Sequence, residues 1–361
     1  MTPLFELIQF AIGTRDDFPS APDSFDSWKE LLLHQVAEHS LVGITFPAIQ
    51  RLSTEGNVPI EIYYSWEVAV KKIVRTNQKQ KAAIVELYRL FLDNGFRNCI
   101  LKGQAMAACY PEPSLRQSGD IDIWLEGDRR RIMSFLGQHF KITETRYIHS
   151  EMKTAEGLKL EVHFTPSWMN APWSNRRLQQ WFKASGDSQF SHYDEALGFC
   201  VPTLAFDAVY ILIHIYRHVL EEGIGLRQLL DYYWVLVNLT ESDRTKALDD
   251  LRYLKLFRFT RAMMYVMVEG FRMDERYLLC EPDSRLGSYL MKSILISGNF
   301  GHSDPRNKNS RTERLVVHGW HKFQRNLRFW SFSLSESLCM PLFVTWQYFW
   351  RRKNGYLNKG R

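Results

Sequence analysis

The sequence has few cysteines and no long apolar run. Its five cysteines are odd in number and scattered, and none forms a Cys-x-x-Cys pair. This pattern argues against a zinc site or a disulfide framework, so we expect reduced thiols in a cytoplasmic protein. The longest apolar stretches, such as residues 208–213, are far shorter than the roughly 20 residues that span a bilayer. We therefore expect no transmembrane segment.

A secretion signal and a strong charge of one sign are missing as well. The first residues lack a basic start, an apolar stretch and a small-residue cleavage site, so we expect no export. The 46 basic residues exceed the 40 acidic ones only slightly, which gives a formal net charge of +6. This balance suits an anionic small molecule and gives no strong nucleic-acid signal.

The abundant residues indicate a folded protein with a large core. Of the 361 residues, 45% are hydrophobic and 14% aromatic, a composition typical of globular chains. Apolar residues at helical spacing dominate both ends of the chain, and strand-like segments lie between them. We predict an α+β protein with an N-terminal helical region (1–95), a central strand-containing region (96–195) and a C-terminal helical region (196–361).

Shorter elements follow from local patterns. The central region predicts strands at residues 99–101 and 120–125, helices at 104–109 and 128–140, and a strand pair within 142–164. The polar run from Ser297 to Arg314 is typical of a mobile loop. The aromatic segment from Leu338 to Trp350 predicts a final helix that packs on the body of the protein, with contact to a membrane surface as the alternative.

Three acidic residues form the most informative pattern of the chain. Asp120 and Asp122 alternate with isoleucines in Gly119-Asp120-Ile121-Asp122-Ile123, so both carboxylates point to one face of a strand. Glu161 lies on a later apolar strand. Neighbouring carboxylates repel each other unless a cation compensates them. The three together supply oxygen ligands for one or two Mg²⁺ ions, or Mn²⁺, whereas solvated strand ends are the competing interpretation.

These residues resemble a known family. The chain contains Leu101-Lys102-Gly103, Tyr110-Pro111-Glu112-Pro113, Leu115-Arg116, Gly119-Asp120-Ile121-Asp122, Glu161-Val162-His163 and, further on, Gly225 to Asp231. It is similar in these motifs to an uncharacterised bacterial nucleotidyltransferase family of the polymerase-beta-like nucleotidyltransferase superfamily. The resemblance implies a small mixed β-sheet nucleotidyltransferase core flanked by N-terminal and C-terminal helical regions.

The same resemblance implies an activity and a set of site residues. A nucleotidyl group would pass from a nucleoside triphosphate, ATP included, to an unknown hydroxyl-bearing acceptor: a small molecule, a sugar or a protein. Asp120, Asp122 and Glu161 would be the catalytic and metal-binding residues. The expected nucleotide-binding residues are Lys102, Gly103, Arg116 and Gly119. Two rival functions are another phosphoryl-type transfer and a catalytically silent nucleotide-binding or scaffold protein.

Some of these assignments have competing interpretations. Gln104 stands where the wider superfamily usually has a serine that contacts phosphate, which favours the silent alternative. Lys102 is either a replacement phosphate ligand or a lysine at a strand end. Arg116 either binds the triphosphate or pairs with Glu112.

The histidines and the C-terminal half contribute further candidates. His163 shares the strand face of Glu161, and we expect an exposed histidine rather than a partner of the acids or a substrate contact. His214 and His218 lie one helical turn apart and are expected to be structural or to contact substrate. Arg227 and Asp231 have helical i, i+4 spacing, which predicts either an ordinary ion pair or a role in closing the site.

Overall fold

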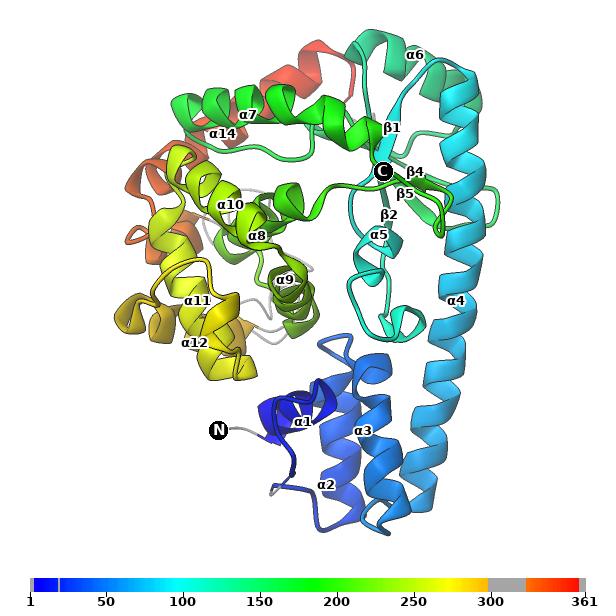
Figure 1. Cartoon of the computed structure of the whole chain (residues 1–361). Helices are drawn as coiled ribbons and strands as arrows, with labels where there is room; N and C mark the ends of the chain where they lie inside the picture. Colours follow the sequence, from blue (N-terminus) through cyan, green and yellow to red (C-terminus); the bar gives the residue numbers. More distant parts are fainter. Residues whose placement is uncertain (1–2, 19, 298–322, 357–361) are drawn as a thin grey trace.

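The N-terminal part of the computed structural model is helical, and one long helix joins it to the sheet (Figure 1). The structure describes residues 3–18, 20–297 and 323–356. The N-terminal elements are α1 (Pro3–Ala11), α2 (Phe25–Glu30), the π-helix η1 (Leu31–Val36), α3 (Val42–Thr54) and α4 (Ile60–Asp93). Because α4 has 34 residues, it reaches from this helical cluster to the central sheet.

The central part contains a small mixed sheet in the order β1-β2-β5-β4-β3. Its strands are β1 (Asn98–Ile100), β2 (Ile121–Leu125), β3 (Glu144–Thr145), β4 (His149–Lys153) and β5 (Lys159–His163). Strands β2 and β5 are parallel, and the other neighbours are antiparallel. The predicted α+β fold with a small mixed sheet and flanking helices is therefore confirmed.

The alternation of side chains along β2 assigns its two faces. Ile121, Ile123 and Leu125 lie in an apolar cluster with residues of α4 and of α6 (Arg129–His139). Asp122 and Trp124 point to the opposite face, where the Trp124 ring lies 4.5 Å from that of Phe190. One face of the strand is thus committed to the core, and the other carries the acidic residue.

Local signals in the sequence explain several element boundaries. The Asp128 side chain accepts hydrogen bonds from the first backbone amides of α6, as an N-cap does. Gly95 ends α4 at a φ of +75° and turns the chain into β1. The turn that joins β4 to β5 contains Gly157, with a φ of +82°. These positive φ values favour glycine, so the turns fall where the sequence predicts them.

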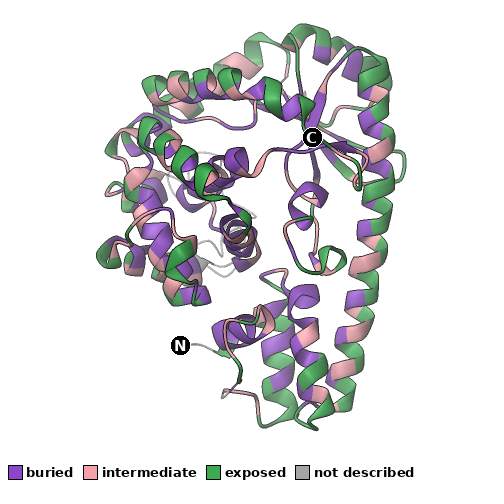
Figure 2. Cartoon of the chain, viewed as in Figure 1, coloured by how far each residue is buried: buried purple, intermediate pink, exposed green. Residues whose placement is uncertain are grey.

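Helices surround the other side of the site and complete the molecule. They are α7 (Pro172–Ser191), α8 (Leu204–Glu221), α9 (Leu226–Asn238), α10 (Glu241–Tyr253), α11 (Phe257–Phe271), α12 (Ser284–Ser297) and α14 (Leu334–Lys353). Residues of α8 and α9 are mostly buried (Figure 2). Helix α1 packs against α11, with Phe5 and Phe271 in edge-to-face contact. The N-terminal and C-terminal helices therefore share one core.

Three expectations differ in detail from the structure or lie outside it. The helix predicted over 104–109 is shorter, and α5 covers only Gln104–Ala107. The predicted loop from Ser297 to Arg314 lies almost entirely outside the described residues. Helix α14 buries Met340 but leaves Leu342 71% exposed, so it packs with one side only. None of the described helices combines the length and apolar character needed to cross a membrane.

Candidate active site

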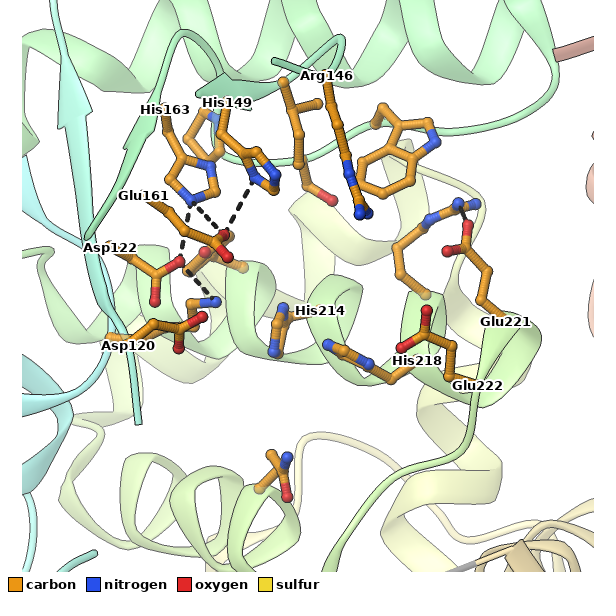
Figure 3. A pocket seen from close by; sticks show the side chains of 18 of the residues that line it. Asp120, Asp122, Arg146, His149, Glu161, His163, His214, His218, Glu221 and Glu222 are labelled. Carbon is orange, nitrogen blue, oxygen red and sulfur yellow. Dashed lines mark hydrogen bonds and ion pairs between the residues drawn. The ribbon is translucent and has the colours of Figure 1, made fainter. Parts of the chain in front are cut away.

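A cavity of about 490 Å³ separates the acidic face of the sheet from helices α8, α9 and α14 (Figure 3). The strand side of this cavity, here called the strand wall, carries Asp120, Asp122, His149, Glu161 and His163. The opposite side, here called the helical wall, carries Tyr210, His214, Arg217, His218, Arg227 and Gln228.

The three predicted acids converge on the strand wall. Asp122 and Glu161 are direct neighbours in the parallel pairing of β2 with β5. Asp120 lies just before β2, and one oxygen of each carboxylate lies within 4.8 Å of the others. Asp122 is 1% exposed, whereas Asp120 is half-buried. The strand spacing therefore brings together the residues that the sequence analysis selected.

Lys102 compensates the deepest of these charges. Its Nζ atom lies 3.0 Å from Asp122 Oδ1. Burial alone would raise the pKa of Asp122, but Lys102 and the hydrogen bond from His163 outweigh it and hold that pKa well below its usual value. Burial would likewise lower the pKa of Lys102, and the surrounding acids, Asp122 first, raise it instead. Asp122 and Lys102 therefore form a charged pair at neutral pH.

A second lysine lies between the other two acids. Lys159 Nζ is 2.5 Å from Glu161 Oε1 and 3.3 Å from Asp120 Oδ2. Its side chain is 51% exposed, so it can turn away into solvent. An ammonium group held between two carboxylates shows that this point favours positive charge. Hard divalent cations prefer oxygen ligands of this kind, so the donor set fits Mg²⁺.

The prediction that His163 is exposed is wrong. His163 is 3% exposed, and its Nε2 atom is 2.9 Å from Asp122 Oδ1, at hydrogen-bond distance. It is buried because Trp124, its neighbour across the β2–β5 pairing, packs into the core beside it. On the next strand, His149 places Nδ1 at 3.1 Å from Glu161 Oε2. A cross-strand pair of histidines therefore borders the acids.

The loop between β1 and β2 is held by a buried ion pair that the sequence analysis did not identify. Arg116 makes two hydrogen bonds to Asp231 of α9, at 2.7 and 2.8 Å. Tyr110 donates a third to the same carboxylate, at 2.7 Å. Of the alternatives considered for these residues, the pairs Arg116–Glu112 and Arg227–Asp231 do not form in the described structure, because Asp231 pairs with Arg116 instead. Because Asp231 already compensates the charge of Arg116, Arg116 is a weak candidate for a triphosphate ligand.

Gly103 adopts a conformation that favours glycine at the start of this loop. Its φ is +60° and its carbonyl accepts a hydrogen bond from Arg116. Gln104, which replaces the usual serine, turns away from the cavity, and its amide donates to Ser118 Oγ at 3.0 Å. The following helix α5 has four residues. Lys102, Gly103, Arg116 and Gly119 all line the cavity, and their contact with nucleotide stays a prediction.

Two amides of α4 that the sequence analysis missed position the loop before β2. Asn77 donates to the carbonyls of Ser114 and Arg116, and Gln80 donates to that of Gly119. Both side chains are buried. Asn77 and Gln80 lie three residues apart on the buried face of α4 that continues with Ala83. Two polar residues on an apolar helix face are the sequence feature that could have identified them.

The two histidines of the helical wall are uncharged, although Arg217 and Arg227 lie on the same wall. Burial lowers the pKa of His214 well below its usual value, and it lowers that of His218 to about 4. Lys102 adds to both effects, so the two imidazoles are neutral at pH 7. Among the described residues, the buried hydroxyl of Tyr210 and Nε of Arg227 have no hydrogen-bond partner. This wall therefore offers uncommitted polar atoms to a bound molecule.

Comparison with known families agrees with this architecture. The model of a family described as an uncharacterised nucleotidyltransferase matches residues 26–272, well over half of the chain. The chain belongs to this family. The matched span of the chain includes the strand wall together with α8 and α9, whereas α12 and α14 lie beyond it.

Other comparisons add little to this assignment. No curated protein matches the sequence significantly. Among solved structures, the chain is similar to the crystal structure of an antigenic nucleotidyltransferase-like protein from Paracoccidioides brasiliensis, with 11% sequence identity and a TM-score of 0.35. That alignment covers 58% of this chain and 96% of the other.

Proposed function

We propose that this protein transfers a nucleotidyl group from a nucleoside triphosphate to a hydroxyl-bearing acceptor, with Mg²⁺ as cofactor. The convergence of Asp120, Asp122 and Glu161 on the strand wall of the cavity supports this proposal most directly. Three carboxylates on adjacent strands repel one another unless they hold cations. Membership of a nucleotidyltransferase family supports a role for the converging acids in holding the cations of the transfer reaction.

The proposed reaction is an in-line displacement at the α-phosphorus of the nucleotide. The acceptor oxygen forms a bond to this phosphorus, the bond to the bridging oxygen of pyrophosphate breaks, and pyrophosphate leaves. A divalent cation held by Asp120, Asp122 and Glu161 would neutralise the charge that develops on the phosphates. Glu161 is the proposed acceptor of the hydroxyl proton, because its carboxylate lines the cavity and is not the partner of Lys102.

Cationic side chains around the cavity complete the nucleotide site in this proposal. Lys102 lines the cavity beside Asp122 and orients that carboxylate. Arg227 reaches the cavity from α9 and donates one hydrogen bond to the Gln117 carbonyl. Since its Nε has no hydrogen-bond partner in the described structure, we assign Arg227, rather than Arg116, to the triphosphate.

The transfer is tested with nucleotides labelled at the α-phosphorus. Each of the four triphosphates is incubated with the protein, Mg²⁺ and fractions of a metabolite and protein extract. We expect label to appear on an acceptor together with released pyrophosphate, and expect Asp122→Asn to abolish both. Asp249→Asn, on the exposed surface of α10, is the matched control. Tight nucleotide binding without transfer to any fraction would favour the catalytically silent alternative.

A further inference from the structure

Glu161 presents its two oxygens to two different sets of groups. Its Oε1 atom faces Lys159, on the side of Asp120. Its Oε2 atom faces two imidazoles, at 3.1 Å from His149 Nδ1 and 3.7 Å from His163 Nε2. A carboxylate in this position can belong to two neighbouring cation sites at once.

The spacing of the donor atoms around Oε2 matches one coordination shell. Ligands bound to one ion at about 2.0–2.2 Å, with angles of 90–110°, lie about 3.0–3.5 Å from each other. The distance from Glu161 Oε2 to His149 Nδ1, 3.1 Å, lies within this range, and that to His163 Nε2, 3.7 Å, is slightly longer. One ligand atom each from His149, Glu161 and His163 lies within 4.8 Å of the others, and all three residues are buried.

The hydrogen bonding of His149 is incomplete without a ligand. Its side chain is 9% exposed, and neither ring nitrogen has a hydrogen-bond partner among the described residues. Nδ1 faces Glu161, and Nε2 lies 3.3 Å from Glu151 Oε1. A carboxylate behind the outer nitrogen is the common arrangement for a histidine that binds a metal through the inner one. Arg146 lies beside Glu151 and compensates its charge.

We propose that His149, Glu161 and His163 form a second divalent-cation site, distinct from the carboxylate site and joined to it through Glu161. When this site is filled, His163 Nε2 binds the cation in place of its hydrogen bond to Asp122, and the imidazole proton is carried by Nδ1, which has no partner in the described structure. Two imidazoles and one carboxylate suit Zn²⁺ or a similar transition metal, whereas Mg²⁺ prefers oxygen ligands alone. The proposal deepens the proposed function, because Glu161 serves both sites. It does not require nucleotide for binding, since all three ligands come from adjacent strands.

Cobalt titration of the metal-stripped full chain tests this site. Co²⁺ reports nitrogen ligands through its visible absorption, and Zn²⁺ should displace it. We expect the wild-type protein to bind Co²⁺ without nucleotide, and expect His149→Gln and His163→Gln each to weaken binding at least about tenfold. His34→Gln, whose side chain is 63% exposed, is the matched control. Because a glutamine side chain can donate to Glu151 or Glu161 in place of the imidazole, that variant is expected to fold.

The outcomes separate this site from the carboxylate site. Asp120→Asn should leave Co²⁺ binding within about twofold of wild type while it weakens Mg²⁺-dependent nucleotide binding. Unchanged Co²⁺ affinity in both histidine variants would overturn the second site, as would binding that depends on Asp120 alone. If the histidine variants lose Co²⁺ but no triphosphate binds the wild-type protein, the second site stands and the proposed function fails.

Discussion

The two walls of the cavity differ in how the charges of their buried polar groups are compensated. On the strand wall, charges neutralise one another: Lys102 pairs with Asp122, and Lys159 bridges Asp120 and Glu161. On the helical wall, burial keeps His214 and His218 neutral, and several polar atoms have no partner in the described structure. Paired charges cost less to bury than isolated ones, so the strand wall is suited to a permanent electrostatic role.

This difference suggests a division of labour within the proposed function. The strand wall would hold cations and phosphates. The cations would replace the lysines beside the acids, and the lysines would neutralise the phosphates. On the helical wall, Arg227 would bind the triphosphate, whereas the neutral imidazoles and the tyrosine hydroxyl are suitable partners for uncharged parts of the substrates. The Arg116–Asp231 pair joins the two walls, since Arg116 precedes β2 and Asp231 lies on α9.

Loss of the deepest acid should have the largest effect. In Asp122→Asn we expect transfer to fall by at least about 10³-fold, because both the cation and Lys102 lose their main counter-charge. Lys102 is then buried without a partner, so the free energy of unfolding should fall by about 3 kcal/mol. Pyrophosphate release and urea denaturation measure the two effects. Activity within tenfold of wild type would contradict the role of the strand wall.

Loss of the Arg116–Asp231 ion pair between the walls should have the second-largest effect. Asp231→Ala leaves the Arg116 guanidinium, 3% exposed, without its carboxylate. We expect a loss of about 3 kcal/mol in the free energy of unfolding, measured by urea denaturation. The double variant Arg116→Met/Asp231→Leu should recover most of this loss, since it removes both charges. A loss below about 1 kcal/mol in Asp231→Ala would show that the pair does not hold the walls together.

The helical wall should make stability depend on pH. The pKa of His218 is lowered to about 4 in the fold and is near 6.5 in the unfolded chain. The unfolded state therefore binds more protons between these values, and stability falls as the pH drops from 6.5 towards 4. We expect about 1–2 kcal/mol to be lost between pH 6.5 and 5. His218→Gln should reduce this slope without abolishing it, because the lowered pKa of His214 acts in the same direction. His34→Gln should retain the slope, and equal slopes in both variants would refute the assignment.

The exposed lysine of the strand wall should have the smallest effect. Lys159 competes with a divalent cation for Asp120 and Glu161, but its side chain is half exposed and screened by solvent. We expect Lys159→Gln to tighten Mg²⁺ binding by about two- to fivefold, as measured by calorimetry. Weaker Mg²⁺ binding in this variant would mean that Lys159 supports the site rather than competing for it.

The sequence predicted the strand wall better than the helical wall, for a physical reason. Asp120 and Asp122 share a face because side chains alternate along a strand, and this holds whatever packs around it. Pairing of β2 with β5 then places Glu161 next to Asp122. The capping of α6 by Asp128 and the glycine turns are also local, so the elements of the central sheet could be predicted closely.

Contacts between distant segments could not be predicted in this way. Arg116 and Asp231 are 115 residues apart, and nothing in either local pattern indicates the other. The burial of His163 depends on how α7 and α8 cover the sheet, which strand alternation does not specify. The division into regions 1–95, 96–195 and 196–361 stays a prediction, as does the cytoplasmic location.

Calorimetric titration with each of the four triphosphates tests the central claim most directly. The titrations compare Mg²⁺ with a chelator, in wild type, Asp120→Asn and the control Asp249→Asn. If the strand wall is a cation-dependent nucleotide site, one or more triphosphates bind wild type and the control only with Mg²⁺, and Asp120→Asn weakens binding at least about tenfold. Nucleotide binding that is indifferent both to Mg²⁺ and to Asp120 would contradict the account.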